Sequence, residues 1–256
     1  SNHLKIIGRA GVGVDNIDVE AATEKGIVVV NSPNGNTLAA AEHTLAMMMS
    51  MARHIPEASK RLHEGHWDKK NLTGVEISGK TLGVIGLGKI GSHVATVAKA
   101  MGMNIVVYDP YAKKEVVEKL NAKLVDDLED FWHEPDFITI HVPKTKETVN
   151  LINKETIAKM KKGVRLVNCA RGGVVNEADL REALDNDYVA GAALDVFCDE
   201  KDITTSPLYG CEKNLVMTPH LGATTFEAQV RVAEDVATQI KIVLQGGKTP
   251  NAVNKL

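Results

Sequence analysis

Side chains that can move protons or bind anions follow several short apolar runs of this chain. They are Asp109, His141, Arg171, Asp195 and His220. A histidine can take a proton from a hydroxyl group near neutral pH, and a neighbouring carboxylate fixes its orientation. An arginine offers paired donors that match a carboxylate. Each residue alone has an ordinary structural explanation, but the set predicts a site. If its substrate is a 2-hydroxy acid, the histidine would take the hydroxyl proton and the arginine would bind the carboxylate.

Arg171 ends a run that otherwise reads as a buried strand. The run is VRLVNCA, residues 164–170, and Gly172 and Gly173 follow the arginine directly. A guanidinium is rarely buried inside a strand without a partner, whereas ligand sites of α/β proteins lie where strands end. We expect Arg171 to bind the substrate, with the glycines giving the backbone room beside it.

A glycine-rich turn indicates a nucleotide site. Gly86, Gly88 and Gly91 have the G-x-G-x-x-G spacing between an apolar run and a helical stretch, which is the context of dinucleotide binding. The first glycine permits a tight turn, the second lets the backbone approach a pyrophosphate, and the third lets helix and strand pack closely. Amide groups at the helix start then bind phosphate. An ordinary tight turn is the alternative.

Asp109 ends the next apolar run. It follows Gly86 at close to the roughly 20 residues expected for the acid that binds ribose hydroxyls. A carboxylate there repels the additional 2′-phosphate of NADP, so the predicted cofactor is NAD. A solvated acid at a strand end is the alternative.

The elements that must position these residues are those of an α/β fold. From Thr81 onward, short runs that are apolar at consecutive positions alternate with helical stretches. Strands of this kind are covered on both faces, so they predict a doubly wound parallel sheet with helices on either side. Ligands of such sheets bind beyond the carboxyl ends of the strands, where the polar residues are expected to lie.

The first part of the chain differs from this pattern. Residues 4–13 and 26–32 read as two strands separated by a short helix, and residues 38–53 form an Ala- and Met-rich helix that is apolar on nearly every face. Such a helix is buried, either in a core or across a subunit interface. A further helix precedes the C-terminal tail.

Composition limits the classes of function. Of the 256 residues, 44 % are hydrophobic and 25 % charged, and the formal net charge is −3. This charge argues against a nucleic-acid binder or an anionic-membrane binder, and no run is long enough to span a bilayer. Cys169, Cys198 and Cys211 have neither metal-ligand spacing nor a disulfide pattern, so we predict no metal and a cytoplasmic protein.

Several motifs together resemble the D-isomer-specific 2-hydroxyacid dehydrogenases. They occur in the order VIGLGKIG, NCARGGVV, GAALDVF and TPHLGATT. Two more, GRAGVGVDNID and NSPNGNT, are similar to the branch of that family that acts on a phosphorylated 2-hydroxy acid. The resemblance covers nearly the whole chain. It implies a Rossmann-type doubly wound sheet that binds NAD, with a partial second, flavodoxin-like substrate domain.

The resemblance also implies roles for individual residues. Arg171 would bind and polarise the substrate, His220 would shuttle the proton, and Glu200 would support His220. The residues implied around the cofactor are Val12, Gly86, Gly88, Lys89, Ile90, Gly91, Asp109, Val142, Cys169, Ala170, Arg171, Asp195, His220, Gly222 and Ala223. Those implied around the small-molecule substrate are Arg9, Asn34, Gly35, Arg171 and His220.

The family pattern also predicts how the chain is divided. Residues 1–28 would be a remnant of the substrate domain, 29–228 the NAD-binding domain, and 229–256 a helix and tail that return to the substrate domain. Helix 38–53 would pack against its copy in a homodimer, which favours the interface interpretation of its methionines. Lys69 and Lys70 would be placed to supply positive charge to a partner, or would be solvated. An N-terminal portion of the substrate domain is expected to be missing.

One position departs from the family pattern. Lys201 follows Glu200 where the family has proline, so Asp199 is an alternative partner for His220. The alternatives for the function as a whole are a dehydrogenase for another small D-2-hydroxy acid, a catalytically weak NAD-binding core, and an NAD sensor of the corepressor type.

Overall fold

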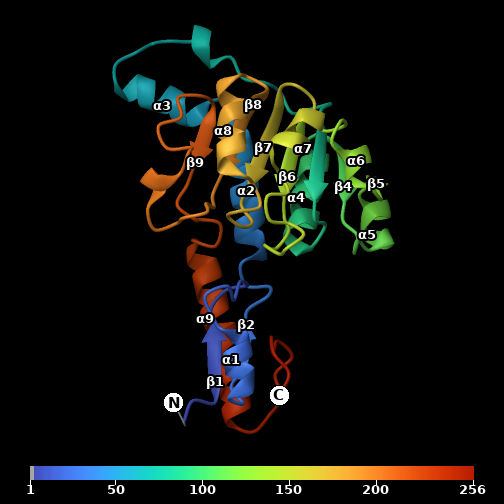
Figure 1. Cartoon of the computed structure of the whole chain (residues 1–256), viewed down its shortest axis with the longest axis vertical. Coiled ribbons are helices and arrows are strands. Elements are labelled where there is room, and N and C mark those ends of the chain that lie inside the picture. Colours follow the sequence, from blue (N-terminus) through green and yellow to red (C-terminus); the bar gives the residue numbers. More distant parts are fainter. Residues whose placement is uncertain (1–2) are drawn as a thin grey trace. The chain divides into compact units, whose positions relative to one another are not determined.

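The computed structural model describes residues 3–256, and these form two compact units (Figure 1). The larger unit is Ala41–Leu221, and the smaller unit combines the residues before Ala41 with Gly222–Leu256. Each unit has a sheet of its own. The chain therefore leaves the smaller unit once and returns to it at the end.

The sheet of the larger unit has seven strands, and every pairing in it is parallel. Across the sheet the order is β5 (Lys123–Val125), β4 (Asn104–Tyr108), β3 (Thr81–Ile85), β6 (Phe137–Ile140), β7 (Val164–Asn168), β8 (Val189–Leu194) and β9 (Leu215–Met217). The strand order reverses between β3 and β6, which is where α/β sheets bind ligands. This arrangement confirms the predicted doubly wound fold.

Helices cover both faces of this sheet (Figure 1). One core lies under α6 (Leu128–Phe131), α7 (Lys154–Lys159) and α8 (Glu177–Asp185). The other lies under α4 (Lys89–Ala100), α5 (Lys114–Lys119) and the part of α2 (Thr37–Ala52) that follows Ala40. Along β4, Val106 belongs to the first core and Ile105 and Val107 to the second, because successive strand side chains point to opposite faces.

An asparagine cap starts α8 directly after the turn that follows β7. Asn176 Oδ1 accepts the amide groups of Ala178 and Asp179, each at 3.1 Å. Such a cap stabilises a helix by about 1 kcal/mol. It also fixes Glu177 at the first position of the helix, close to the glycine turn.

Helix α2 contributes methionines to the core of the larger unit. Met47, Met48 and Met51 are 3 % exposed or less within the single chain, so the interface interpretation is wrong for these three side chains. The helix ends at Ala52 because His54 has a left-handed φ of 52° and Pro56 lies in the first turn of the next helix. That helix, α3 (Ile55–His63), is followed by the short 3₁₀ turn Lys70–Leu72.

The smaller unit holds a two-stranded parallel sheet. Its elements are β1 (Ile6–Arg9), α1 (Val19–Glu24), β2 (Val28–Asn31) and the long helix α9 (Phe226–Leu244). Gly8 on β1 leaves room for Val236 and Ile240 of α9, because a β-carbon there would lie within 3 Å of both side chains. The C-terminal tail also joins this unit, since the Val253 amide donates to the Val29 carbonyl at 2.8 Å.

The boundaries of these two units differ from those of the predicted domains. Residues 28–31 read like a strand of the nucleotide domain, but β2 pairs with β1 instead of entering the seven-stranded sheet. The first boundary therefore lies after Ala40 rather than after residue 28, and the second lies before Gly222 rather than after residue 228. Within residues 3–256, no helix is both long enough and apolar enough to cross a membrane.

Candidate functional site

The predicted phosphate loop lies at the reversal point of the large sheet. Gly86 follows β3 with a φ of +92°, and a β-carbon on it would lie 2.7 Å from the His141 carbonyl oxygen after β6. A β-carbon on Gly91 would lie 2.1 Å from the Gly86 oxygen, whereas one on Gly88 would meet nothing within 4 Å. The first and third glycines therefore allow close packing, and the second faces open space at the start of α4. This is the arrangement that a pyrophosphate requires.

Asp109 at the end of β4 ties this loop to the next strand. Its Oδ2 accepts the Leu87 amide at 2.6 Å, and its Oδ1 accepts the Tyr111 amide at 2.8 Å. Lys89 and Ile90 are the first residues of α4, and Val142 lies against the Gly86 turn. The open space over Gly88, the amide groups at the start of α4 and the carboxylate of Asp109 fit the diphosphate and ribose of a dinucleotide.

Arg171 lies on a turn that Asn168 holds in place. The buried Asn168 donates from Nδ2 to the Arg171 carbonyl and accepts the Ala170 amide at Oδ1, each at 3.0 Å. Arg171 Nη1 donates to the Ala170 carbonyl at 2.7 Å. The glycine that follows packs directly on another strand end, since a β-carbon on Gly172 would lie 1.8 Å from the Phe197 oxygen. The predicted role of the glycines, to give the backbone room, agrees with this contact.

His220 contacts one of the two carboxylates proposed for it. Its Nδ1 lies 2.8 Å from Glu200 Oε2. Asp199 instead accepts the backbone amide of Lys201 at 2.9 Å, which caps the turn after Glu200. The geometry therefore favours Glu200 as the partner of His220. Both side chains of this pair remain close to half exposed, at 47 % and 42 %.

The fully buried Asp195 fixes the backbone around His220. Its Oδ1 accepts the Thr218 hydroxyl at 2.5 Å and the Leu221 amide at 2.7 Å, and it lies 3.2 Å from Nε2 of His43. Its carbonyl accepts the His220 amide at 2.9 Å. These bonds hold His220 in the left-handed region, with a φ of 54°, which is uncommon for a residue other than glycine.

Burial changes the protonation of two further residues near these turns. It lowers the pKa of His141 to about 4, so this imidazole is neutral at physiological pH; its Nε2 lies 2.9 Å from the Thr139 hydroxyl. It raises the pKa of Cys169 to about 12, so this thiol stays protonated. Neither group is therefore suited to act as the proton shuttle or as a nucleophile.

Six of the residues predicted to touch cofactor or substrate belong to the smaller unit. They are Arg9, Val12, Asn34, Gly35, Gly222 and Ala223. Arg9 Nη1 donates to the Ala10 carbonyl at 2.6 Å, while its buried Nε has no partner within residues 3–256. The Val12 carbonyl accepts from Asn31 at 2.7 Å, and the Gly35 carbonyl accepts from Arg231 at 3.0 Å.

Sequence reasoning missed three residues that shape the site. They are Asn168, His43 and Thr218, which support Arg171 and Asp195 through side-chain bonds. Asn168 stands directly before the predicted site turn, and this position was the available signal. His43 gave no such signal, because it lies far away in the sequence on a helix that reads as buried. Among the residues that the structure describes, no cluster of side chains has the composition of a metal site.

The comparisons with known proteins agree with this geometry. The sequence model of the D-isomer specific 2-hydroxyacid dehydrogenase NAD binding domain matches residues 45–222. The chain belongs to the D-isomer specific 2-hydroxyacid dehydrogenase family. The matched segment is the NAD-binding domain of the family, which confirms the predicted cofactor class and Rossmann-type fold.

Several curated relatives and solved structures of this family cover nearly the whole chain. The chain is 58 % identical over 253 residues to the D-3-phosphoglycerate dehydrogenase of a Synechocystis species, which is 99 % of this chain and 45 % of that protein. It is 53 % identical over 251 residues to the D-3-phosphoglycerate dehydrogenase of Methanocaldococcus jannaschii, covering 98 % and 48 %. The chain thus spans about half the length of the curated relatives it matches.

Two solved structures show how closely the fold agrees. The TT0316 protein from Thermus thermophilus has a TM-score of 0.90 at 37 % identity, with 98 % of this chain and 79 % of that chain covered. D-lactate dehydrogenase from Aquifex aeolicus, complexed with NAD and lactic acid, has a TM-score of 0.85 at 34 % identity, with 95 % and 77 % covered.

Proposed function

We propose that this protein oxidises D-3-phosphoglycerate to 3-phosphohydroxypyruvate with NAD, the first step of L-serine biosynthesis. The observation that carries the reaction type is the bond between His220 Nδ1 and Glu200 Oε2 at the carboxyl ends of the sheet strands. The choice of substrate is supported by the names of the relatives with the highest identities reported above.

In this mechanism the chain's own residues move a proton and hold the substrate. Because Nδ1 of His220 is bonded to Glu200, Nε2 is the atom that takes the proton from the C2 hydroxyl group. Glu200 fixes the ring and stabilises the positive charge that it gains. Arg171 binds the substrate carboxylate with paired donors. Bound NAD would supply the acceptor for the C2 hydride, which balances the oxidation of the alcohol to the ketone.

The cofactor would be held by groups that the fold has already oriented. Amide groups of the Gly86–Gly91 turn would bind the pyrophosphate, Asp109 the ribose hydroxyls and Asp195 the carboxamide. The remaining contacts are assigned to Val12, Lys89, Ile90, Val142, Cys169, Ala170, Gly222 and Ala223. For the substrate, Arg9, Asn34 and Gly35 of the smaller unit keep the roles that the family resemblance implies.

The test of this function is NADH consumption by the purified chain with four oxo acids. They are 3-phosphohydroxypyruvate, hydroxypyruvate, pyruvate and 2-oxoglutarate, and an NADH titration is run in parallel. Arg171→Ala is the blank. Loss of paired charged hydrogen bonds predicts a fall in kcat/KM of about 100-fold, whereas NADH affinity should fall less, because Arg171 is only one of the residues assigned around the cofactor.

Each outcome separates the alternatives. Preference for the phosphorylated substrate that Arg171→Ala abolishes supports the proposal. Preference for another oxo acid keeps the mechanism and replaces the substrate. Tight NADH binding without turnover of any oxo acid would contradict the enzymatic proposal and favour a weak NAD-binding core or a sensor.

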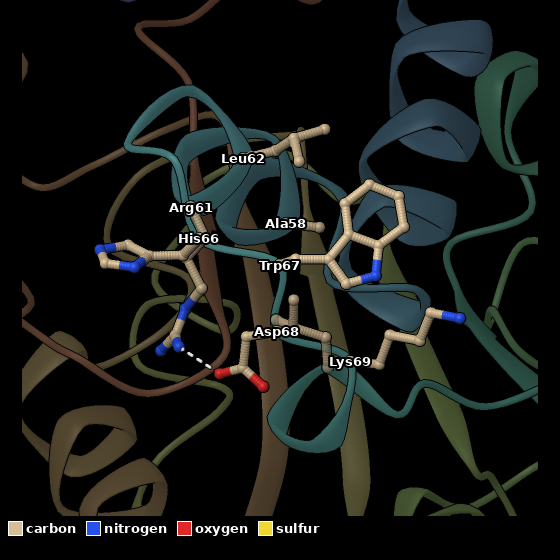
Figure 2. Close-up of a pocket in the computed structure, with 8 residues that line it drawn as sticks. Ala58, Arg61, Leu62, His66, Trp67, Asp68 and Lys69 are labelled. Atoms are coloured by element: carbon tan, nitrogen blue, oxygen red, sulfur yellow. Dashed lines mark hydrogen bonds and ion pairs between the residues drawn. The ribbon is translucent and has the colours of Figure 1, made fainter.

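We also propose that the protein forms a homodimer in the cytoplasm. The three cysteines are free thiols, as expected in a reducing compartment. Helix α3 buries none of its residues, and Leu62 and Trp67 are 57 % and 80 % exposed beside the Arg61–Asp68 ion pair (Figure 2). Apolar exposure of this kind marks an interaction site, so α3 and Trp67 would contribute to the dimer interface in place of the buried α2 methionines.

Sedimentation tests this assembly. Trp67→Ser with Leu62→Ser should yield a monomer, because these substitutions remove the exposed apolar area, and Lys114→Ser, at an exposed lysine of α5, serves as the control. A wild-type chain that sediments as a monomer at all concentrations would contradict the dimer.

A further inference from the structure

A buried carboxylate near the site has no role in the mechanism described above. Glu177, the first residue of α8, is 7 % exposed. A carboxylate is rarely buried without partners, because it loses its hydration. The positive end of the α8 dipole favours its charge. The buried carboxylate also needs hydrogen-bond donors in place of water, and residues 198 and 206 supply them.

These donors lie at the two ends of one segment. Glu177 Oε1 accepts the backbone amide of Cys198 at 2.6 Å, and Glu177 Oε2 accepts the hydroxyl group of Ser206. The segment between these two donors, residues 198–206, contains Glu200. One carboxylate thus joins both ends of the segment that presents the partner of His220.

Two side chains of this segment bond within it. Asp199 accepts the Lys201 amide, and Asp202 accepts the Thr204 amide at 3.0 Å. A pocket lies along the segment on the side of α8 and is lined by Glu177, Cys198, Asp199, Thr205, Ser206 and Pro207, among others. Side-chain packing is therefore incomplete on this side, and the bonds of Glu177 connect the segment to the helix.

The surroundings of Cys198 agree with an intact carboxylate contact. Partial burial raises the pKa of its thiol, and a hydrogen bond with Glu177 raises the pKa further. The thiol thus stays protonated beside the carboxylate. Phe197, one residue earlier, packs on Gly172 of the Arg171 turn. The segment is therefore bonded to Glu177 at Cys198, directly after the residue that contacts the Arg171 turn.

We propose that Glu177 is a positioning residue that holds residues 198–206 so that the Glu200 carboxylate meets Nδ1 of His220. The proposal rests on the proposed function, because it assigns Glu177 a role in proton transfer by His220. Glu177 acts through Glu200 and contacts neither substrate nor cofactor in this scheme.

Turnover measurements on three variants test the proposal. Glu177→Gln removes one acceptor oxygen at nearly constant volume, and Ser206→Ala removes one of the two anchors. Glu155→Gln is the matched control, an exposed glutamate in the first turn of α7. We expect kcat to fall about tenfold in Glu177→Gln and less in Ser206→Ala, as for the loss of one charged hydrogen bond, with KM and NADH affinity within about twofold of wild type. Glu155→Gln should match wild type.

A double-mutant comparison separates positioning from a general effect on folding. In the Glu200→Gln background the carboxylate that Glu177 positions is already gone, so adding Glu177→Gln should lower kcat by less than about twofold. A merely structural role would lower kcat by the same factor in both backgrounds and overturn the proposal.

A spectroscopic readout makes the test independent of turnover. In ¹⁵N-histidine-labelled chain, the Nδ1 resonance of His220 should shift in Glu177→Gln towards its position in Glu200→Gln, because the His220–Glu200 bond weakens. An unchanged resonance in both Glu177→Gln and Ser206→Ala would overturn the proposal. If Glu200→Gln and His220→Ala both retain wild-type turnover, the proposed function fails instead.

Discussion

The carbonyl oxygen of Phe197 lies so close to Gly172 that a β-carbon on this glycine would stand 1.8 Å from it. Phe197 lies in the segment that follows β8, and Gly172 follows Arg171 after β7. The contact joins the turn of the proposed substrate-binding arginine to the segment that carries Glu200. Two proposed catalytic side chains from different strands are thereby held by one backbone contact.

Gly172→Ala should therefore disturb both stability and turnover. No side chain can move aside to relieve this clash, because the opposing atom belongs to the backbone. We expect the free energy of unfolding to fall by about 1–3 kcal/mol, the usual range for overpacking, and kcat/KM to fall as Arg171 and Glu200 separate. Urea unfolding and steady-state kinetics measure the two effects. If the free energy of unfolding and kcat/KM both match wild type, the backbone has shifted to accommodate the methyl group and the contact is not required.

Gly88→Ala should have the opposite profile. A β-carbon there meets nothing within 4 Å, and the φ of −68° suits alanine, so the urea midpoint should stay near that of wild type. The new methyl group would occupy the space over the helix start that we assign to the pyrophosphate. NADH affinity should fall about tenfold or more, measured by fluorescence titration. Unchanged affinity would place the pyrophosphate elsewhere.

Glu200→Gln and Asp199→Asn form a matched pair, since each removes one charge from the same segment. Only Glu200 contacts His220, so Glu200→Gln should lower kcat by about 100-fold, at the lower end of what general acid–base catalysis contributes. Asp199→Asn keeps an oxygen for the Lys201 amide and should lower kcat less than about threefold. A larger fall in kcat in Asp199→Asn than in Glu200→Gln would indicate that Asp199 is the functional partner of His220.

His141 should make stability depend on pH. Its pKa is about 4 in the folded chain and 6.5 when exposed, so between these values the unfolded chain binds a proton that the folded chain does not. The free energy of unfolding should therefore fall as pH drops from 6.5 towards 4, by up to about 3 kcal/mol from this group. Urea unfolding of His141→Gln should show a weaker dependence on pH in this window. His63→Gln, on exposed α3, is the control and should behave as wild type.

Much of the fold could be predicted because local patterns and tertiary contacts agree along most of the chain. The apolar runs that form β3, β4 and β6 are buried on both faces. Apolar residues at consecutive positions predict this burial. The pattern failed at β2, since a run of valines does not specify which strand it will pair with. For the α2 methionines it was the family resemblance that gave the interface interpretation, whereas Met47, Met48 and Met51 are buried in the core; the helix pattern alone allows both kinds of burial.

The sequence by itself determined which chemistry is available: a phosphate loop at Gly86–Gly91, an acid at Asp109, and an arginine and a histidine at strand ends. These signals are local, because spacing along one turn sets the geometry of that turn. Only the tertiary structure decided that Glu200 rather than Asp199 meets His220, and that His43, Asn168 and Glu177 support the site. Those choices depend on contacts between residues far apart in the chain, which form only when separate strands and helices pack together.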